Sequence, residues 1–305
     1  MTDWEGWEAT RFVSVPALEV AAELAHAVAR AALGDNWESA SGRCDLREIC
    51  RQGGFNAQRL DRRFSTSSHD ALLVPQQNGT FSILVDPLPK NEVTLADDLA
   101  RHRNRFRIAH EIGHSFFYDR RVPPPLRLFP CSDKEEAFCD EFASALLVPR
   151  SIIRNITPSP ANVFVIAQKY DVSVELAARA VAKVHPAISI AGLLWKPHPT
   201  KAGRPNLRVA WSAGPRFIPR NAALHSETVS RAAIEGESHG VENLNAAGLR
   251  GGFSVQAARL PKRKQMIVFL SPAEEGAEES RESGAKIVPL VFETHPIGMG
   301  TRSDI

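Results

Sequence analysis

Apolar residues recur at helical spacing in several stretches of the first 184 residues. Residues 17–33 are rich in alanine and leucine, and Gly34 directly follows them, which favours a helix end at that point. The other segments with helical signals are residues 44–52, residues from about Leu95 to about Tyr118, residues 132–149, and a pair of short helices within 159–184.

Local signals set the limits of these helices. Ser132 followed by Glu135 forms a capping box at the start of one helix, and Pro149 ends that helix. Four prolines within residues 120–130 exclude a helix from the preceding segment.

Strand patterns occur in two places. Residues 71–74 and 80–85 are β-rich runs that flank Asn78-Gly79, a favoured two-residue hairpin turn. After His185 the chain consists mainly of apolar, β-branched segments separated by turn residues, with one helix-like segment at 226–236. The strand-like segments are residues 188–195, 207–213, 252–260, 265–271 and 287–293.

These patterns predict an α+β protein with two domains. The first, residues 1–187, combines helices with a small sheet and includes the helical pair at about 159–184. The second, residues 188–305, is mainly an antiparallel sheet with a helix. Residues 298–305 are predicted to be a disordered tail.

Composition narrows the class of protein. The chain has 305 residues, of which 43% are hydrophobic and 24% charged, as in soluble globular proteins. No apolar run is long enough to cross a membrane, and the N-terminus does not have the pattern of a signal peptide, so we expect a cytoplasmic protein. A net charge of +2 does not indicate nucleic-acid binding, and the basic clusters at 101–107 and 261–265 are expected to be solvated. The cysteines, Cys44, Cys50, Cys131 and Cys139, indicate neither a disulfide framework nor a thiolate zinc site.

The predicted third helix carries the sequence His-Glu-Ile-Gly-His at residues 110–114. His110 and His114 are four residues apart and so lie on one face, where each can offer a nitrogen to one metal ion. Glu111 is near enough to hold a water bound to that metal. Gly113 costs about 1 kcal/mol in a helix, which is tolerable where another segment approaches closely. The alternative is a pair of partly buried histidines with a solvated glutamate.

The predicted fourth helix supplies further ligands. Glu136 can complete the coordination sphere, and Asp140, one turn later, can accept the remaining N–H of a ligating histidine. The alternative for both is a charged helix face, and Glu135 and Glu141 are expected to be only that.

These two helices together resemble those of the ImmA/IrrE metallopeptidases. The resembling segments are "RFRIAHEIGHSFFYD" and "EAFCDEFASALLVP", within a similarity that covers about residues 42–184. Cys139 stands where the family usually has a small residue. The resemblance implies a zincin-like core, with His110, His114 and Glu136 as metal ligands and Glu111 as the catalytic glutamate.

The resemblance also implies an intracellular zinc endopeptidase that cleaves a DNA-binding transcriptional repressor in stress or mobile-element regulation. Two histidines and a glutamate suit Zn²⁺, and the same set can hold Mn²⁺ or Fe²⁺. A free edge of the hairpin sheet could bind an extended substrate. Tyr118 is a candidate donor to the oxyanion, and its alternative role is packing.

A non-catalytic metal-binding or DNA-binding regulator is the other hypothesis. The helical pair at 159–184 has the rhythm of a DNA-binding module. Its cations, Lys169, Arg179 and Lys183, are offset by Asp171 and Glu175, so direct nucleic-acid binding is not expected. Residues 188–305 are expected to regulate the protein or to recognise its substrate.

Overall fold

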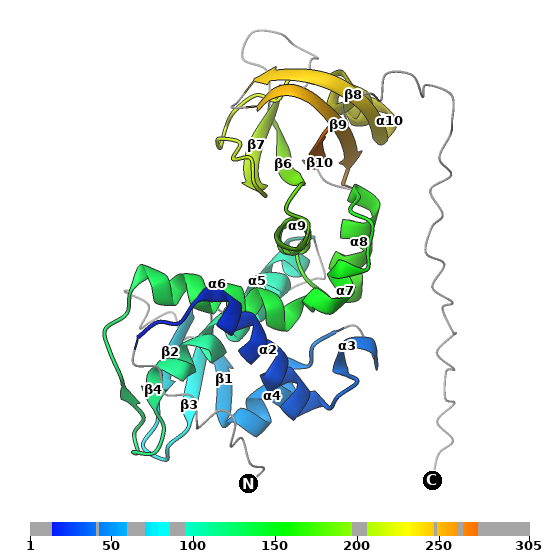
Figure 1. Cartoon of the computed structure of the whole chain (residues 1–305). Coiled ribbons are helices and arrows are strands. Elements are labelled where there is room, and N and C mark those ends of the chain that lie inside the picture. The colour runs from blue at the N-terminus through cyan, green and yellow to red at the C-terminus, as the bar shows by residue number, and fades with distance from the viewer. Residues whose placement is uncertain are drawn as a thin grey trace, which may run out of the picture. The chain divides into compact units, whose positions relative to one another are not determined.

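A computed structural model describes residues 14–40, 43–59, 71–85, 95–196, 206–246, 249–260 and 265–273. The chain divides into two units, residues 1–272 and residues 273–305. The structure is of mixed α and β type, as predicted (Figure 1). The predicted strand at 287–293 and the predicted tail lie outside the described residues, and the domain boundary at 187/188 stays a prediction.

The helices of eight or more residues form where the apolar spacing predicts them, whereas the short helices α3, η2 and α7 were not predicted. Serine or aspartate side chains accept the first free N–H groups of five helices, at Asp45, Ser132, Ser159, Ser173 and Ser226. The helices are α2 (Leu18–Leu33), α3 (Trp37–Ala40), α4 (Leu46–Gly53), α5 (Leu95–His114), η2 (Ser115–Phe117), α6 (Asp133–Leu147), α7 (Arg150–Arg154), α8 (Pro160–Lys169), α9 (Val174–Val184) and α10 (Glu227–Glu235).

The first sheet has the order β1-β3-β2, so β2 is at its edge among the described residues. Strand β3 (Phe81–Val85) pairs in parallel with β1 (Phe55–Arg59) and antiparallel with β2 (Ala71–Pro75). The predicted hairpin is present, but the prediction of a two-residue turn was wrong. Gln76 and Thr80 remain paired, and residues 77–79 form a three-residue turn in which the Gly79 N–H donates to the Gln76 carbonyl at 3.0 Å and Gly79 has a φ of +83°.

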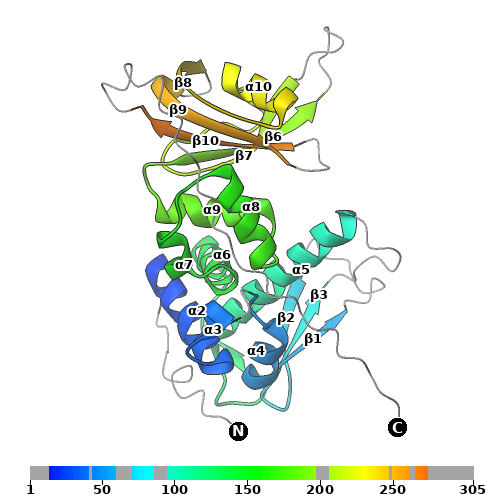
Figure 2. The ribbon, with the colours of Figure 1, turned by 90° about the vertical axis from the view of Figure 1, so that its right-hand side faces the viewer.

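A second sheet contains five antiparallel strands in the order β7-β6-β10-β9-β8. Its strands are β6 (Ser189–Lys196), β7 (Asn206–Ala213), β8 (Glu237–Ala246), β9 (Leu249–Arg259) and β10 (Gln265–Pro272). Alternate residues of β10 enter two cores: Met266 and Val268 pack in a cluster with residues of α10, and Ile267 and Phe269 in a cluster with the helical region. Helix α10 therefore covers one face, and α8 and α9 cover the other (Figure 2).

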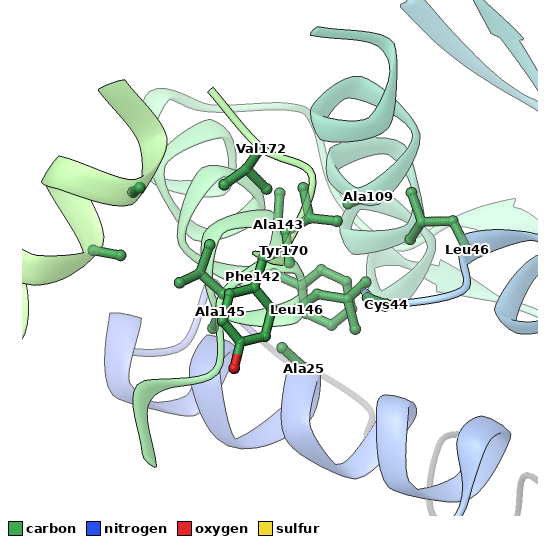
Figure 3. Close-up of a cluster of buried hydrophobic side chains, with 14 of the residues drawn as sticks. Ala25, Cys44, Leu46, Ala109, Phe142, Ala143, Ala145, Leu146, Tyr170 and Val172 are labelled. Carbon is green, nitrogen blue, oxygen red and sulfur yellow. The ribbon is translucent and has the colours of Figure 1, made fainter. Parts of the chain in front are cut away.

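The core of the helical region is centred on α6. Phe142 and Leu146 are fully buried and lie beside Tyr170 and Val172 from the α8–α9 connection, with Ala25 of α2 on another side (Figure 3). The helical pair thus packs on the helices that carry the predicted site.

A buried carboxylate, Glu141, and a largely buried one, Asp171, join the helical pair to α5 and α6. Asp171, between α8 and α9, lies 2.8 Å from Arg101 Nη2, 3.1 Å from His102 Nε2 and 3.3 Å from Arg43 Nε. Glu141 on α6 pairs with Lys183 of α9 and with Arg150 of α7. The expectation that Glu141 is solvated was therefore wrong, because these cations reach it only in the folded chain.

The basic cluster at 101–107 was also expected to be solvated, and for Arg105 this was wrong. Its side chain is buried, donates from Nη2 to the Cys44 carbonyl at 3.0 Å, and lies 3.7 Å from Asp171. Helix α5 ends at His114 instead of continuing to Tyr118. The chain then passes through η2 to β4 (Tyr118–Asp119), which pairs with β5 (Leu126–Arg127) in the proline-rich segment.

Candidate metal centre

Helix α5 presents His110 and His114 one turn apart, with their rings directed at each other. The two Nε2 atoms are 3.1 Å apart, and 15% and 12% of the respective side chains are exposed. This is the arrangement that the four-residue spacing predicted for two nitrogens facing one ion.

Glu136 of α6 faces the same point. One carboxylate oxygen is 3.2 Å from His110 Nε2 and the other is 3.5 Å from His114 Nε2. The Cys131 thiol donates to this carboxylate at 3.2 Å. The three predicted ligands therefore lie within one small space.

Gly113 allows α5 and α6 to approach this closely. A Cβ atom at residue 113 would lie 3.2 Å from the Cα of Cys139 and 3.3 Å from its Sγ. The absence of a side chain at residue 113 thus brings the two helices that carry the site into contact.

The second nitrogen of each histidine is bound by a carboxylate. His110 Nδ1 donates to Asp140 at 2.9 Å, which is the partnership predicted from the spacing of α6. His114 Nδ1 donates to Glu135 at 2.6 Å. The expectation that Glu135 is a solvated charge was therefore wrong, because its side chain is fully buried between His114 and Arg127.

Arg127 of β5 balances the charge of Glu135. Its Nη2 donates to both carboxylate oxygens at 2.6 Å, and its Nε donates to the Phe129 carbonyl at 3.0 Å. Burial acts to raise the pKa of Glu135, but the hydrogen bonds from His114 and Arg127 hold it below its usual value. Glu135 therefore remains ionised.

Sequence reasoning missed Glu135 and Arg127. A signal was present for Glu135, which shares the spacing of Phe138 and Phe142 and so lies on the buried face of α6. No local signal was present for Arg127, because its role depends on how the proline-rich segment folds back.

Tyr118 has a packing role. Its hydroxyl accepts from Arg127 Nη1 at 3.2 Å, and its ring meets Phe81 edge-on with centroids 5.3 Å apart. Arg127 also lies over the Tyr118 ring. These contacts account for the side chain without an oxyanion role.

Glu111 is buried beside the histidines. Burial raises its pKa, opposed by the charges of His114 and His110 and by a hydrogen bond from the backbone of Leu73. The Leu73 contact places this carboxylate against β2, the edge strand of the first sheet.

Neighbouring carboxylates also shift the pKa of His110. Burial acts to lower its pKa, but the hydrogen bond with Asp140 and the charges of Asp140, Glu111 and Glu136 hold it above the ordinary value.

Cys139 offers a different third ligand, since one ligand atom from each of His110, His114 and Cys139 lies within 4.8 Å of the others. The thiol is fully buried, and burial together with the nearby carboxylates, Glu135 first, raises its pKa far above the ordinary value. The Glu136 carboxylate, which faces both imidazole nitrogens, is the other candidate for the third ligand. The burial and raised pKa of the Cys139 thiol favour a packing role over a redox role.

Comparisons with known proteins address the family. Residues 66–181 match the Peptidase_M78 family model, described as the IrrE N-terminal-like domain. No curated protein matches the chain. A solved structure, a Mycobacterium tuberculosis transcriptional regulator, is 13% identical with a TM-score of 0.40, over 83% of this chain and 75% of that one. Within the described residues, no helix is both long and apolar enough to cross a membrane.

The matched residues include both helices of the candidate metal centre and the edge strand beside Glu111. Residues 66–181 are therefore similar to the IrrE N-terminal-like domain of the Peptidase_M78 family, in agreement with the resemblance to the ImmA/IrrE metallopeptidases.

Proposed function

We propose that the protein is a metal-dependent endopeptidase in which His110, His114 and Glu136 hold the metal ion. The observation that carries this proposal is the convergence of three electron-rich groups. The carboxylates of Asp140 and Glu135 bind the two Nδ1 atoms, and this leaves the two Nε2 atoms facing each other, 3.1 Å apart and beside Glu136. Two nitrogens this close share either a proton or a metal ion, and the carboxylate beside them supplies the third ligand that a metal needs.

The donor set fits zinc. Two imidazole nitrogens and one carboxylate are the protein ligands of several catalytic zinc sites, which leave a fourth position open. When bound, zinc lowers the pKa of a coordinated water towards about 7 and polarises a substrate carbonyl. The same ligands also accept Mn²⁺ or Fe²⁺.

Glu111 is the proposed general base. Glu111 directly follows His110 on α5, and its carboxylate lies near the ligands. It is not itself a proposed ligand, so it is available for proton transfer. Its raised pKa favours accepting a proton from the attacking water, and the proton then passes to the leaving amine. The hydrogen bond from Leu73 orients the carboxylate for this task.

Strand β2 is the proposed substrate-binding edge. It pairs only with β3 among the described residues, and its Leu73 backbone reaches Glu111. An extended peptide that added to this edge would pass beside the catalytic glutamate. We propose a protein substrate, and the family resemblance suggests a DNA-binding repressor involved in stress or mobile-element regulation.

The alternative is a non-catalytic regulator that binds metal or DNA. The cations of the helical pair are engaged within the fold: Lys169 lies over the Tyr170 ring, Arg179 pairs with Glu175, and Lys183 pairs with Glu141. This leaves few charges for phosphate contacts, so we favour the peptidase.

The test compares new protein N-termini in native-host cells that express either the intact chain or Glu111→Gln at equal abundance, with and without stress. The substitution retains the ligands, and the zinc content of both purified proteins is measured alongside. Cleavage of one or a few proteins by the intact chain alone supports the proposal and identifies the substrate. If both proteins contain zinc and the two sets of cells have identical protein N-termini, the result would favour the non-catalytic regulator.

A further inference from the structure

A cavity of about 580 Å³ lies between α9 and the helix-facing side of the five-stranded sheet. Its walls come from the first turns of α9, from β6, β7 and β10, and from residues 217–220. The volume is within the range of small-molecule sites, about 300–1,000 Å³. None of the lining residues belongs to α5 or α6, so the cavity is separate from the metal centre.

Two aromatic side chains line this cavity. The Trp211 indole occupies the space that a side chain at residue 192 would need, since a Cβ atom on Gly192 would lie 2.2 Å from the ring. Phe217 also lines the cavity, and 76% of it is exposed. A phenylalanine this exposed beside a fixed indole provides an apolar surface that suits a planar ligand.

The charges around the cavity favour an anion. Arg179 lies over the Trp211 ring at 5.7 Å and is paired with Glu175, so these two charges cancel. Arg220 lines the same cavity, and within the described part of the chain its guanidinium has no ion-pair partner. The N-terminus of α9, at Ser173, adds partial positive charge at the wall.

We propose that this cavity binds a small aromatic anion. The aromatic part of the ligand would pack against Trp211 and Phe217, and its carboxylate, sulfonate or phosphate group would pair with Arg220. A guanidinium and two aromatic rings that line one cavity provide both kinds of contact. The proposal does not depend on the peptidase activity.

The test uses two probes with the same rings, the anionic 8-anilinonaphthalene-1-sulfonate and the neutral N-phenyl-1-naphthylamine. Binding to the full chain is measured by calorimetry and by probe fluorescence. The variants are Arg220→Ala and Trp211→Leu, and the control is Arg250→Ala, which removes an exposed arginine of β9 outside the cavity.

We expect one equivalent of the anionic probe to bind saturably. Arg220→Ala should weaken its affinity by about fivefold or more and leave the neutral probe unchanged, because only the charged contact is lost. Trp211→Leu should weaken both probes, and Arg250→Ala neither.

Absence of saturable binding would overturn the proposal, as would anionic-probe affinities that are equal in the Arg220→Ala and Arg250→Ala proteins. Circular dichroism and urea unfolding establish that each variant is folded. If Trp211→Leu fails to fold, the comparison of Arg220→Ala with Arg250→Ala still decides the outcome, because both replace exposed arginines.

Discussion

The carboxylate of Glu135 lies 2.6 Å from His114 Nδ1 and accepts from Arg127 Nη2 on both of its oxygens. A fully buried acid on α6 thus joins a histidine on α5 to an arginine on β5. Such a partner fixes the tautomer and orientation of a ligating imidazole.

Replacing Glu135 by Gln should therefore weaken metal binding without removing a ligand. We expect zinc affinity to fall by about 10–100-fold, since outer partners of ligating histidines have effects of this size. Zinc affinity is measured by competition with a chromogenic chelator. Asp133→Asn, an exposed acid in the first turn of the same helix, is the control. Equal affinities for the two variants would contradict the role assigned to Glu135.

The identity of the third ligand can be decided by comparing Glu136→Gln with Cys139→Ser. We expect Glu136→Gln to lower zinc affinity by at least about 100-fold, more than the loss of an outer partner, and Cys139→Ser to lower it by less than about threefold. The reason is that the Glu136 carboxylate faces both imidazoles, whereas the Cys139 thiol is fully buried where α6 packs on Gly113 of α5. The reverse order of affinities would identify Cys139 as the ligand.

Gly113→Ala should destabilise the protein even though alanine favours helices. Alanine gains about 1 kcal/mol in helix propensity. Its Cβ would lie 3.2 Å from the Cα of Cys139, and this backbone atom belongs to a buried helix that cannot move alone. Overpacking typically costs about 1–3 kcal/mol, so we expect a net loss of about 1 kcal/mol in the free energy of unfolding. Urea unfolding measures this change in the free energy of unfolding. A variant more stable than the unsubstituted protein would contradict the prediction and show that α6 can shift away from residue 113.

Asp171→Asn should destabilise the protein in a pH-dependent way. Burial acts to raise the pKa of Asp171, but Arg43, Arg101, Arg105 and His102 hold it below its usual value. A lowered pKa means that the stabilisation is complete above the unfolded pKa of about 3.9 and is lost as the pH falls through the folded pKa. Asparagine tolerates the left-handed backbone at this position, where φ is 52°, so the substitution tests the charge.

We expect Asp171→Asn to lower the free energy of unfolding by roughly 3 kcal/mol at pH 7, because a largely buried carboxylate that faces three arginines loses its charge. The difference from the unsubstituted protein should narrow below about pH 4. Urea unfolding across this pH range measures it. Asp35→Asn, which removes one partner of an exposed pair with Arg30, should change stability by no more than about 0.5 kcal/mol. A difference for Asp171→Asn that persists undiminished at low pH would exclude the electrostatic explanation.

Local pattern was enough to predict most of the elements. The helical spacing of apolar residues, the capping serines and the two runs of the hairpin act over a few residues, so their signals are readable in the sequence. The strands β1 and β8 were not predicted because they lack such local signals. β1 is held by its parallel pairing with β3, and β8 is a polar strand held by β9. Pairing with a distant strand leaves no local pattern.

By itself, the sequence determined which side chains could share one face of a helix: His110 with His114, and Glu136 with Asp140. Helix periodicity is a local property, so these pairs could be read directly. The tertiary structure alone decided which acids are buried. Glu135, Glu141 and Asp171 have their partners on other elements, namely Arg127, Lys183 and the arginines of α5. A buried charge is tolerated only where such a partner reaches it, and that depends on how the whole chain packs.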